Sequence, residues 1–101
     1  MNPVYTITSP ASRDVERIAN YLAENSSLER SDRFLQGITI KLKRLAQFPQ
    51  IGRSRDDLSP LLRSLSYESY LIFYRTKDAS IEILRVVSGY QDLNELFGSE
   101  E

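Results

Sequence analysis

The spacing of apolar residues changes along the chain, and the changes predict the order of secondary structure. Residues 4–8 are β-branched or aromatic, which is typical of a short strand. Apolar residues then recur every three or four positions, first over 15–22 and again over 34–45. This spacing predicts two amphipathic helices. Because only residues 25–27 break the pattern between them, we expect the helices to form a hairpin.

Capping residues and helix breakers set the expected helix boundaries. Ser9 followed by Pro10 is typical of an N-cap and a first helical position, so the first helix is expected from Ser9 to about residue 24. Ser26 stands three residues before a glutamate, which is a capping-box pattern for the second helix. Pro49 ends that helix. Gly37 lies inside it, where glycine costs up to ~1 kcal/mol relative to alanine, so we expect a close packing contact there.

Three strands are predicted after the helices, at about 62–66, 70–76 and 81–87. Residues 77–80 are typical of a hairpin turn between the last two. The stretch 71–74 is apolar on both faces, so we expect its strand to be central and covered on both sides. The order β-α-α-β-β-β indicates an α+β fold in which the helix hairpin covers an antiparallel meander. Residues 92–97 are expected to form one further helical turn.

Composition narrows the chemistry. With 101 residues and no repeat or linker, the chain is expected to be a single domain, 1–101. It has no cysteine and no histidine, which removes thiolate metal sites, disulfides and the commonest general base near neutral pH. We therefore expect no metal site and no cofactor. No apolar run approaches the ~20 residues of a membrane span, and no secretion signal is visible, so a cytoplasmic location is expected.

Charge is unevenly distributed although the net charge is −1. Over residues 41–63 six basic residues face two acidic ones, a balance of +4. Over residues 64–101 three basic residues face seven acidic ones, a balance of −4. A general nucleic-acid binder carries a basic excess, because phosphate neutralisation supplies most of its affinity. We therefore expect no direct sequence-specific binding of nucleic acid.

Arginines and aromatic residues are frequent at binding hot spots. The candidate binding residues are Arg53, Arg55, Arg63, Arg75, Arg85 and Tyr90. Arg75 and Arg85 fall on adjacent predicted strands, where pleat alternation can place them on one face. Structural alternatives stay open: Asp56 and Asp57 could form local salt bridges in the loop, Arg85 lies between apolar residues, and Tyr90 could serve in packing.

Several separated segments together resemble a known family. They are Pro49–Arg53, Asp56–Leu58, Leu62–Ser64, Tyr70–Arg75 and Ile83–Gly89 followed by Asp92-Leu93. In this order and over residues 4–97 they resemble ParE-type toxins of the RelE/ParE toxin–antitoxin superfamily. The chain differs at two tail positions, where Ser88 and Gln91 replace a histidine and an arginine that ParE-like proteins often carry.

The resemblance implies the RelE/ParE fold, a helix hairpin packed on a small, mainly antiparallel sheet. It also implies the toxin component of a type II toxin–antitoxin system, which inhibits DNA gyrase by binding rather than by catalysis. Its partners would be DNA gyrase and a ParD-like antitoxin, which forms a hetero-oligomer with the toxin and wraps its C-terminal segment around it. Tyr21, Leu28 and the outer faces of the helices are the candidate antitoxin contacts.

Two alternatives stay open beside gyrase inhibition. A RelE-type mRNA endonuclease would need a base, an acid and cations around the reacting phosphate. By rough alignment, Gln91 stands where such nucleases have a tail arginine, and Phe97 stands near their tyrosine. No catalytic residue is therefore assigned, and we expect the protein not to be an enzyme. The other alternative is an inactive toxin homologue that binds only its antitoxin.

Overall fold

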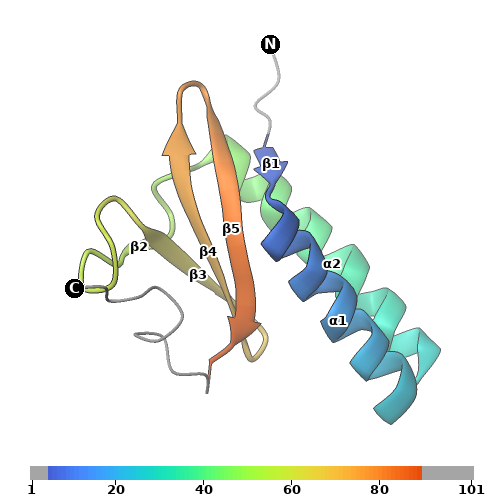
Figure 1. Cartoon of the computed structure of the whole chain (residues 1–101). Coiled ribbons are helices and arrows are strands. Elements are labelled where there is room, and N and C mark those ends of the chain that lie inside the picture. Colours follow the sequence, from blue (N-terminus) through green and yellow to red (C-terminus); the bar gives the residue numbers. More distant parts are fainter. Residues whose placement is uncertain (1–4, 90–101) are drawn as a thin grey trace.

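Two helices and five strands make up residues 5–89, the part of the chain that the computed structural model describes (Figure 1). In chain order they are β1 (Tyr5–Ile7), α1 (Ser9–Asn25), α2 (Leu28–Gln47), β2 (Arg53–Ser54), β3 (Arg63–Tyr67), β4 (Tyr70–Lys77) and β5 (Ser80–Ser88). The predicted α+β order is confirmed, with β2 as an additional short strand. Tyr90 and the helical turn expected over 92–97 lie outside the described residues.

The strands form one sheet in the order β1-β5-β4-β3-β2. β1 runs parallel to β5, with Tyr5 opposite Ile81, and the other neighbours are antiparallel. The expectation of a mainly antiparallel sheet with β4 at its centre is therefore confirmed. The β4–β5 register shifts between Phe73 and Tyr74, which marks a bulge in the ladder. The predicted turn between these strands is present, and Asp78 adopts a φ of 55° within it.

The cap of α1 is Thr8, so the prediction of Ser9 as N-cap is wrong. The Thr8 hydroxyl oxygen accepts a hydrogen bond from the Ala11 N–H at 3.3 Å, and the hydroxyl donates to the Ile83 carbonyl at 3.0 Å. Thr8 caps the helix because its one hydroxyl group makes both contacts, with the first turn of α1 and with β5. Thr8 therefore fixes the start of α1 against the sheet.

The cap of α2 is Ser27, so the prediction of Ser26 as the cap is wrong. Ser27 Oγ accepts from the Arg30 N–H at 3.0 Å. Ser26 instead closes α1, because its own N–H donates to the Leu22 carbonyl at 2.9 Å. Only Ser26 and Ser27 stand between the two helices, and each of them caps one helix. This short connection confirms the expected helix hairpin.

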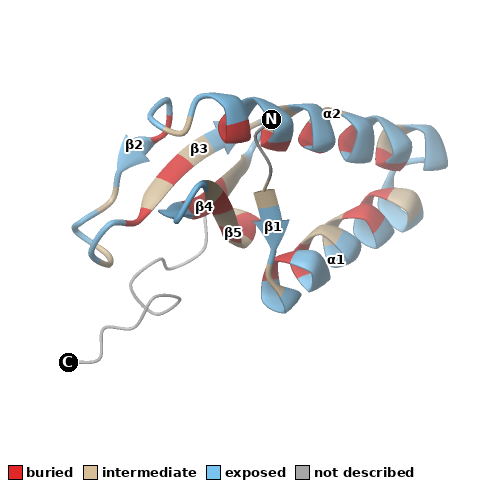
Figure 2. Cartoon of the chain, turned by 90° about the horizontal axis from the view of Figure 1, so that it is seen from above, coloured by how far each residue is buried: buried red, intermediate tan, exposed pale blue. Residues whose placement is uncertain are grey.

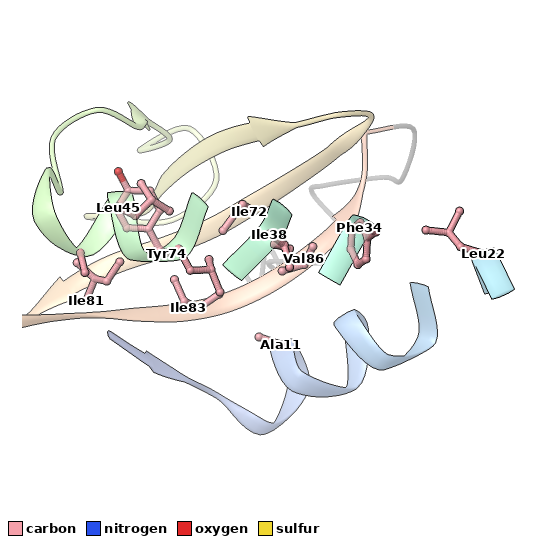
Figure 3. Packing of buried hydrophobic residues seen from close by; sticks show 12 residues of the cluster. Ala11, Leu22, Phe34, Ile38, Leu45, Ile72, Tyr74, Ile81, Ile83 and Val86 are labelled. Carbon is pink, nitrogen blue, oxygen red and sulfur yellow. The ribbon is translucent and has the colours of Figure 1, made fainter. Parts of the chain in front are cut away.

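Buried apolar side chains form two clusters, one on each face of the sheet. The helix-side cluster brings α2 against β4 and β5 (Figure 3). Its buried members include Phe34, Ile38, Leu42, Leu45, Ile72, Tyr74, Ile81, Ile83 and Val86. The loop-side cluster consists of Leu62, Phe73 and Val87, with Leu58, Leu71 and Leu84 packed against it. Alternate residues of β4 enter different clusters, so the expectation that this strand is covered on both sides is confirmed.

The helices lie on one side of the sheet, and their buried residues follow the inward stripe (Figure 2). Gly37 of α2 allows this close approach, because a Cβ there would overlap the Tyr67 side chain. The Tyr67 ring in turn lies 5.9 Å from that of Phe34. The predicted close contact at Gly37 is confirmed. Leu35, one of the apolar residues within 34–45, is 37% exposed, since it faces a groove between the two helices.

Candidate functional site

The sheet face opposite the helices, here called the loop face, carries Ser64, Ser66, Leu71 and Phe73. Leu71 and Phe73 belong to the loop-side cluster, and the register pairs them with Ser66 and Ser64. Arg53 of β2 lies opposite Ser64. Because directly opposed residues in a sheet project to the same side, Arg53 also lies on the loop face.

Arg63 holds the turn that follows α2. Its Nη1 donates to the Gly52 carbonyl at 2.6 Å and its Nη2 to Gln50 Oε1 at 2.8 Å. The Tyr74 side chain contacts the same turn. Its hydroxyl donates a hydrogen bond to the Pro49 carbonyl at 2.7 Å and accepts one from the Gly52 N–H at 2.9 Å. Burial raises the pKa of the Tyr74 phenol. The contacts of Arg63 are therefore made within its own chain.

Arg55 is fixed in a similar way in the loop between β2 and β3. Its guanidinium donates two hydrogen bonds to Asp57, both 3.1 Å, and lies 5.9 Å from the centre of the Phe73 ring. The hydrogen bonds from Arg55 lower the pKa of the Asp57 carboxyl. Asp56 accepts from the Leu61 N–H at 3.1 Å, where the backbone has a φ of 66°. The local salt bridge considered from sequence is present, and this loop covers part of the loop face.

Arg75 and Arg85 bind different carboxylates. Arg75 Nε donates to Glu82 on the neighbouring strand at 3.0 Å. Arg85 donates two hydrogen bonds, of 2.7 and 2.9 Å, to Asp14 of α1. Lys77 is 4.0 Å from Glu82. The two arginines therefore do not form one cationic cluster. The structural role considered for Arg85 has a physical basis, which is its pair of hydrogen bonds to Asp14.

Arg53 differs from the other four arginines. Within residues 5–89 its exposed side chain has no hydrogen bond or ion pair. It borders a hollow of about 280 Å³ on the loop face. The other residues that line this hollow are Ile51, Arg55, Ser64, Leu65, Ser66 and Leu71. Arg53 therefore combines an available guanidinium with a recessed surface. The sixth candidate, Tyr90, is outside the described residues.

A larger groove of about 430 Å³ lies between the two helices and β1, and we call it the helix groove. Its apolar lining is Tyr5, Ile7, Val15, Ala19, Leu35, Ile38 and Leu42. Leu35 and Ile7 remain 37% and 42% exposed there. Tyr21 and Leu28, the antitoxin contacts suggested from sequence, are 60% and 73% exposed but do not line it. The sequence signal for this groove is the adjacent pair Phe34-Leu35. The pair makes the apolar face of α2 wider than the single row of residues that faces the core.

Two classes of site can be checked directly in the described part of the chain. Among residues 5–89 no group of three or more metal-binding side chains is placed to hold an ion. None of the helices described there is long and apolar enough to cross a membrane.

Comparisons with known proteins agree on one family. The sequence model for "ParE toxin of type II toxin-antitoxin system, parDE" matches residues 5–93. Toxin ParE3 of Caulobacter vibrioides is 32% identical over 93 residues, which cover 92% of this chain and 93% of that protein. Toxin ParE1 of Mycobacterium tuberculosis is 27% identical over 95 residues, or 93% and 97% of the two chains. A solved structure described as "Chromosomal ParDE TA system from P. aeruginosa" matches with a TM-score of 0.74 and 25% identity, covering 85% of this chain and 95% of that one. This chain therefore belongs to the ParE toxin family of type II toxin–antitoxin systems.

Proposed function

We propose that this toxin inhibits DNA gyrase by binding to it and that a ParD-like antitoxin neutralises the toxin. Family membership supports the toxin role. The observation that supports the binding mechanism is the loop face, where the Arg55 guanidinium is held by Asp57 and the exposed Arg53 side chain makes no hydrogen bond or ion pair within residues 5–89. A rigidly held arginine beside an exposed one, both at the border of a hollow, suits recognition of another protein.

The tyrosines of the described sheet favour binding over cleavage of RNA. Burial raises the pKa of Tyr67, Tyr70 and Tyr74, so each phenol keeps its proton near neutral pH. The Tyr74 proton is moreover donated to a backbone carbonyl. None of these three phenols is therefore an effective proton acceptor for an attacking ribose hydroxyl. The chain also has no histidine that could accept the proton instead.

The helix groove is the surface that best suits the antitoxin. It is floored by apolar side chains from both helices and bordered by polar ones, among them Glu16, Asn20 and Thr39. An amphipathic helix binds such a groove by placing its apolar face inward and its polar face toward the border. Burial of Leu35 and Ile7 would supply favourable free energy, because both remain partly exposed in the free toxin.

Induction of the toxin in a bacterium tests the proposal against its alternatives. We expect an SOS response and filamentous cells, which follow from damage to DNA by blocked gyrase. Arg53→Ala should weaken this response, whereas Lys43→Ala should not, because Lys43 is an exposed residue of α2 with the same charge. Rapid arrest of translation with cut mRNA would indicate the nuclease instead. Absence of any growth defect would indicate a homologue that binds only its antitoxin.

A further inference from the structure

Exposed basic side chains along α2 have no carboxylate partner. They are Arg33, Lys43 and Arg44. Within residues 5–89 none of them forms an ion pair or a side-chain hydrogen bond. The acidic residues of α2, Glu29 and Asp32, lie near its start, and no acidic residue follows in the sequence until Asp56. The C-terminal half of the helix therefore presents positive charge to solvent.

Exposed apolar side chains lie between these cations. Ile40 is 68% exposed, and Phe48, the C-cap of α2, is 51% exposed. Residues four apart are neighbours on a helix surface, so Ile40, Arg44 and Phe48 follow one another along the outside of α2. The Arg44 guanidinium lies 5.7 Å from the centre of the Phe48 ring. The helix dipole explains a cation near a C-terminus, but it does not explain the exposed apolar residues on either side of Arg44.

This surface lies on the side of α2 that is turned away from the sheet (Figure 2). We call it the basic helix face, and its residues are Arg33, Ile40, Lys43, Arg44 and Phe48. A helix turns by about 100° per residue, so Ile40 projects about 140° away from Leu35, which lines the helix groove. The basic helix face shares no residue with the helix groove or with the hollow beside Arg53.

A ligand that suits this face has carboxylates for the cations and apolar side chains for Ile40 and Phe48. We propose that the basic helix face binds an acidic amphipathic helix of a partner protein, which lies along α2 with its apolar stripe on these two residues. From residue 33 to residue 48 the face is about 22 Å long, enough for about four turns of such a helix. An amphipathic helix binds by an apolar stripe, and flanking charges set its orientation.

Charge complementarity and the exposed apolar residues together favour this occupant over other polyanions. A phosphate backbone would use the cations but leave Ile40 and Phe48 without apolar contacts. The net charge of −1 also gives the toxin no long-range attraction to a polyanion. An anionic lipid surface requires a continuous apolar stripe, whereas Arg44 interrupts the one on this face.

The inference goes beyond gyrase inhibition and does not rest on it. Because the basic helix face and the helix groove have no residue in common, we expect the toxin to bind the acidic helix whether or not the groove is occupied. Failure of the tests below would leave the gyrase proposal intact. Failure of gyrase inhibition would likewise leave this interaction unaffected.

The probe is a fluorescent synthetic peptide of about 20 residues, or about 30 Å as a helix, made of leucine, alanine and glutamate with the leucines on one stripe. A control peptide has the same composition, with its leucines distributed around the helix. Fluorescence anisotropy during titration with the toxin measures both affinities. We expect the striped peptide to bind at least about tenfold more tightly, because its leucines can be buried together. Equal affinities, or no binding of the striped peptide, would overturn the proposal.

Competition distinguishes the other possible ligands. A short unlabelled DNA duplex and phosphatidylserine vesicles are each added to the toxin with the striped peptide bound, at the same concentration of negative charge and at physiological salt. We expect neither to displace the peptide. Displacement by the duplex or by the vesicles would overturn the proposal, because phosphate or lipid would then be the preferred ligand.

Matched substitutions test the location. Lys43→Glu should weaken binding of the striped peptide at least about tenfold, since repulsion replaces attraction. Arg13→Glu makes the same charge change at an exposed position of α1 and should leave the affinity unchanged. Ile40→Ser should weaken binding several-fold, whereas Leu28→Ser should not, because Leu28 is 73% exposed on another side of α2. Circular dichroism and Tm establish that the variants are folded. Equal effects within either pair would contradict the proposal.

Discussion

Asp14 joins α1 to the end of β5 through charged hydrogen bonds, although only 1% of its side chain is exposed. Burial alone would raise the pKa of this carboxyl. Hydrogen bonds from Arg85, from the Val86 N–H and from Arg17 outweigh burial, and the pKa is lowered. The Val86 N–H donates a hydrogen bond of 2.9 Å to the Asp14 carboxylate. Asp14 therefore also provides an acceptor for a backbone N–H of β5 beyond the part that pairs with β1.

The lowered pKa of Asp14 predicts a specific loss of stability in acid. A group whose folded pKa is depressed stabilises the fold above its unfolded pKa, about 3.9, and this contribution is lost as pH falls through the folded pKa. Asp14→Asn should lower the free energy of unfolding by about 2–3 kcal/mol at pH 7 and reduce the dependence on pH below about 4. Urea unfolding of both proteins from pH 7 to pH 2.5 measures this. An unchanged pH dependence in the variant would contradict it.

Gly52 is required by the Tyr74 hydroxyl rather than by its own backbone angles. A Cβ at Gly52 would overlap that hydroxyl, which is held by two hydrogen bonds in a fully buried ring. Gly52→Ala should therefore destabilise the fold by about 1–3 kcal/mol. Gly89→Ala is the matched control, because its Cβ would lie 3.6 Å from the nearest atom, an ordinary contact. Thermal unfolding that shows equal changes in both variants would refute the explanation.

At the residue scale, the sequence supplied candidate arginines but not the groups that they contact within the fold. Arg85 and its carboxylate at Asp14 are 71 residues apart, and no local pattern connects them. Arg63 binds Gly52 and Gln50 across a turn whose geometry depends on the buried Tyr74. Arg55 is the exception, because Asp57 is its near neighbour in sequence and the salt bridge could be considered beforehand.

At the element scale, periodicity was sufficient for the helices and the long strands. Each has enough residues for a repeat of 3.6 or 2 to be recognised. β2 has only two residues, too few to show any alternation, so the sequence does not predict it. The parallel pairing of β1 with β5 and the groove between the helices also depend on tertiary packing. Caps were misplaced by one residue because Thr8 and Ser27 adjoin equally suitable serines.

The helix groove predicts a difference between two exposed apolar residues of α2. Leu35 lines the groove, whereas Ile40, which is 68% exposed, does not. If the antitoxin buries Leu35, Leu35→Glu should weaken its binding at least about tenfold, the equivalent of ~1.4 kcal/mol. Ile40→Glu should bind as the unchanged toxin does. Titration calorimetry with the antitoxin measures both, and an equal effect of the two substitutions would exclude the groove as the site.

At the scale of the whole molecule, stability and binding should be separable on the loop face. Arg55 packs over Phe73 and pairs with Asp57, so Arg55→Ala should lower stability by about 1 kcal/mol. Arg53 makes no such contact within residues 5–89, so Arg53→Ala should weaken toxicity and leave Tm nearly unchanged. A fall in Tm for Arg53→Ala that matches its loss of toxicity would mean that the residue is structural.

The fold as a whole presents cations that are anchored by carboxylates and carbonyls, and burial raises the pKa of the Tyr67, Tyr70 and Tyr74 phenols. Titration of the purified toxin into a gyrase supercoiling and DNA-cleavage assay tests this mechanism most directly. We expect dose-dependent loss of supercoiling with accumulation of cleaved DNA, reversed by the antitoxin and weakened by Arg53→Ala. Unaltered gyrase activity at saturating toxin, together with cleavage of mRNA on translating ribosomes, would contradict it.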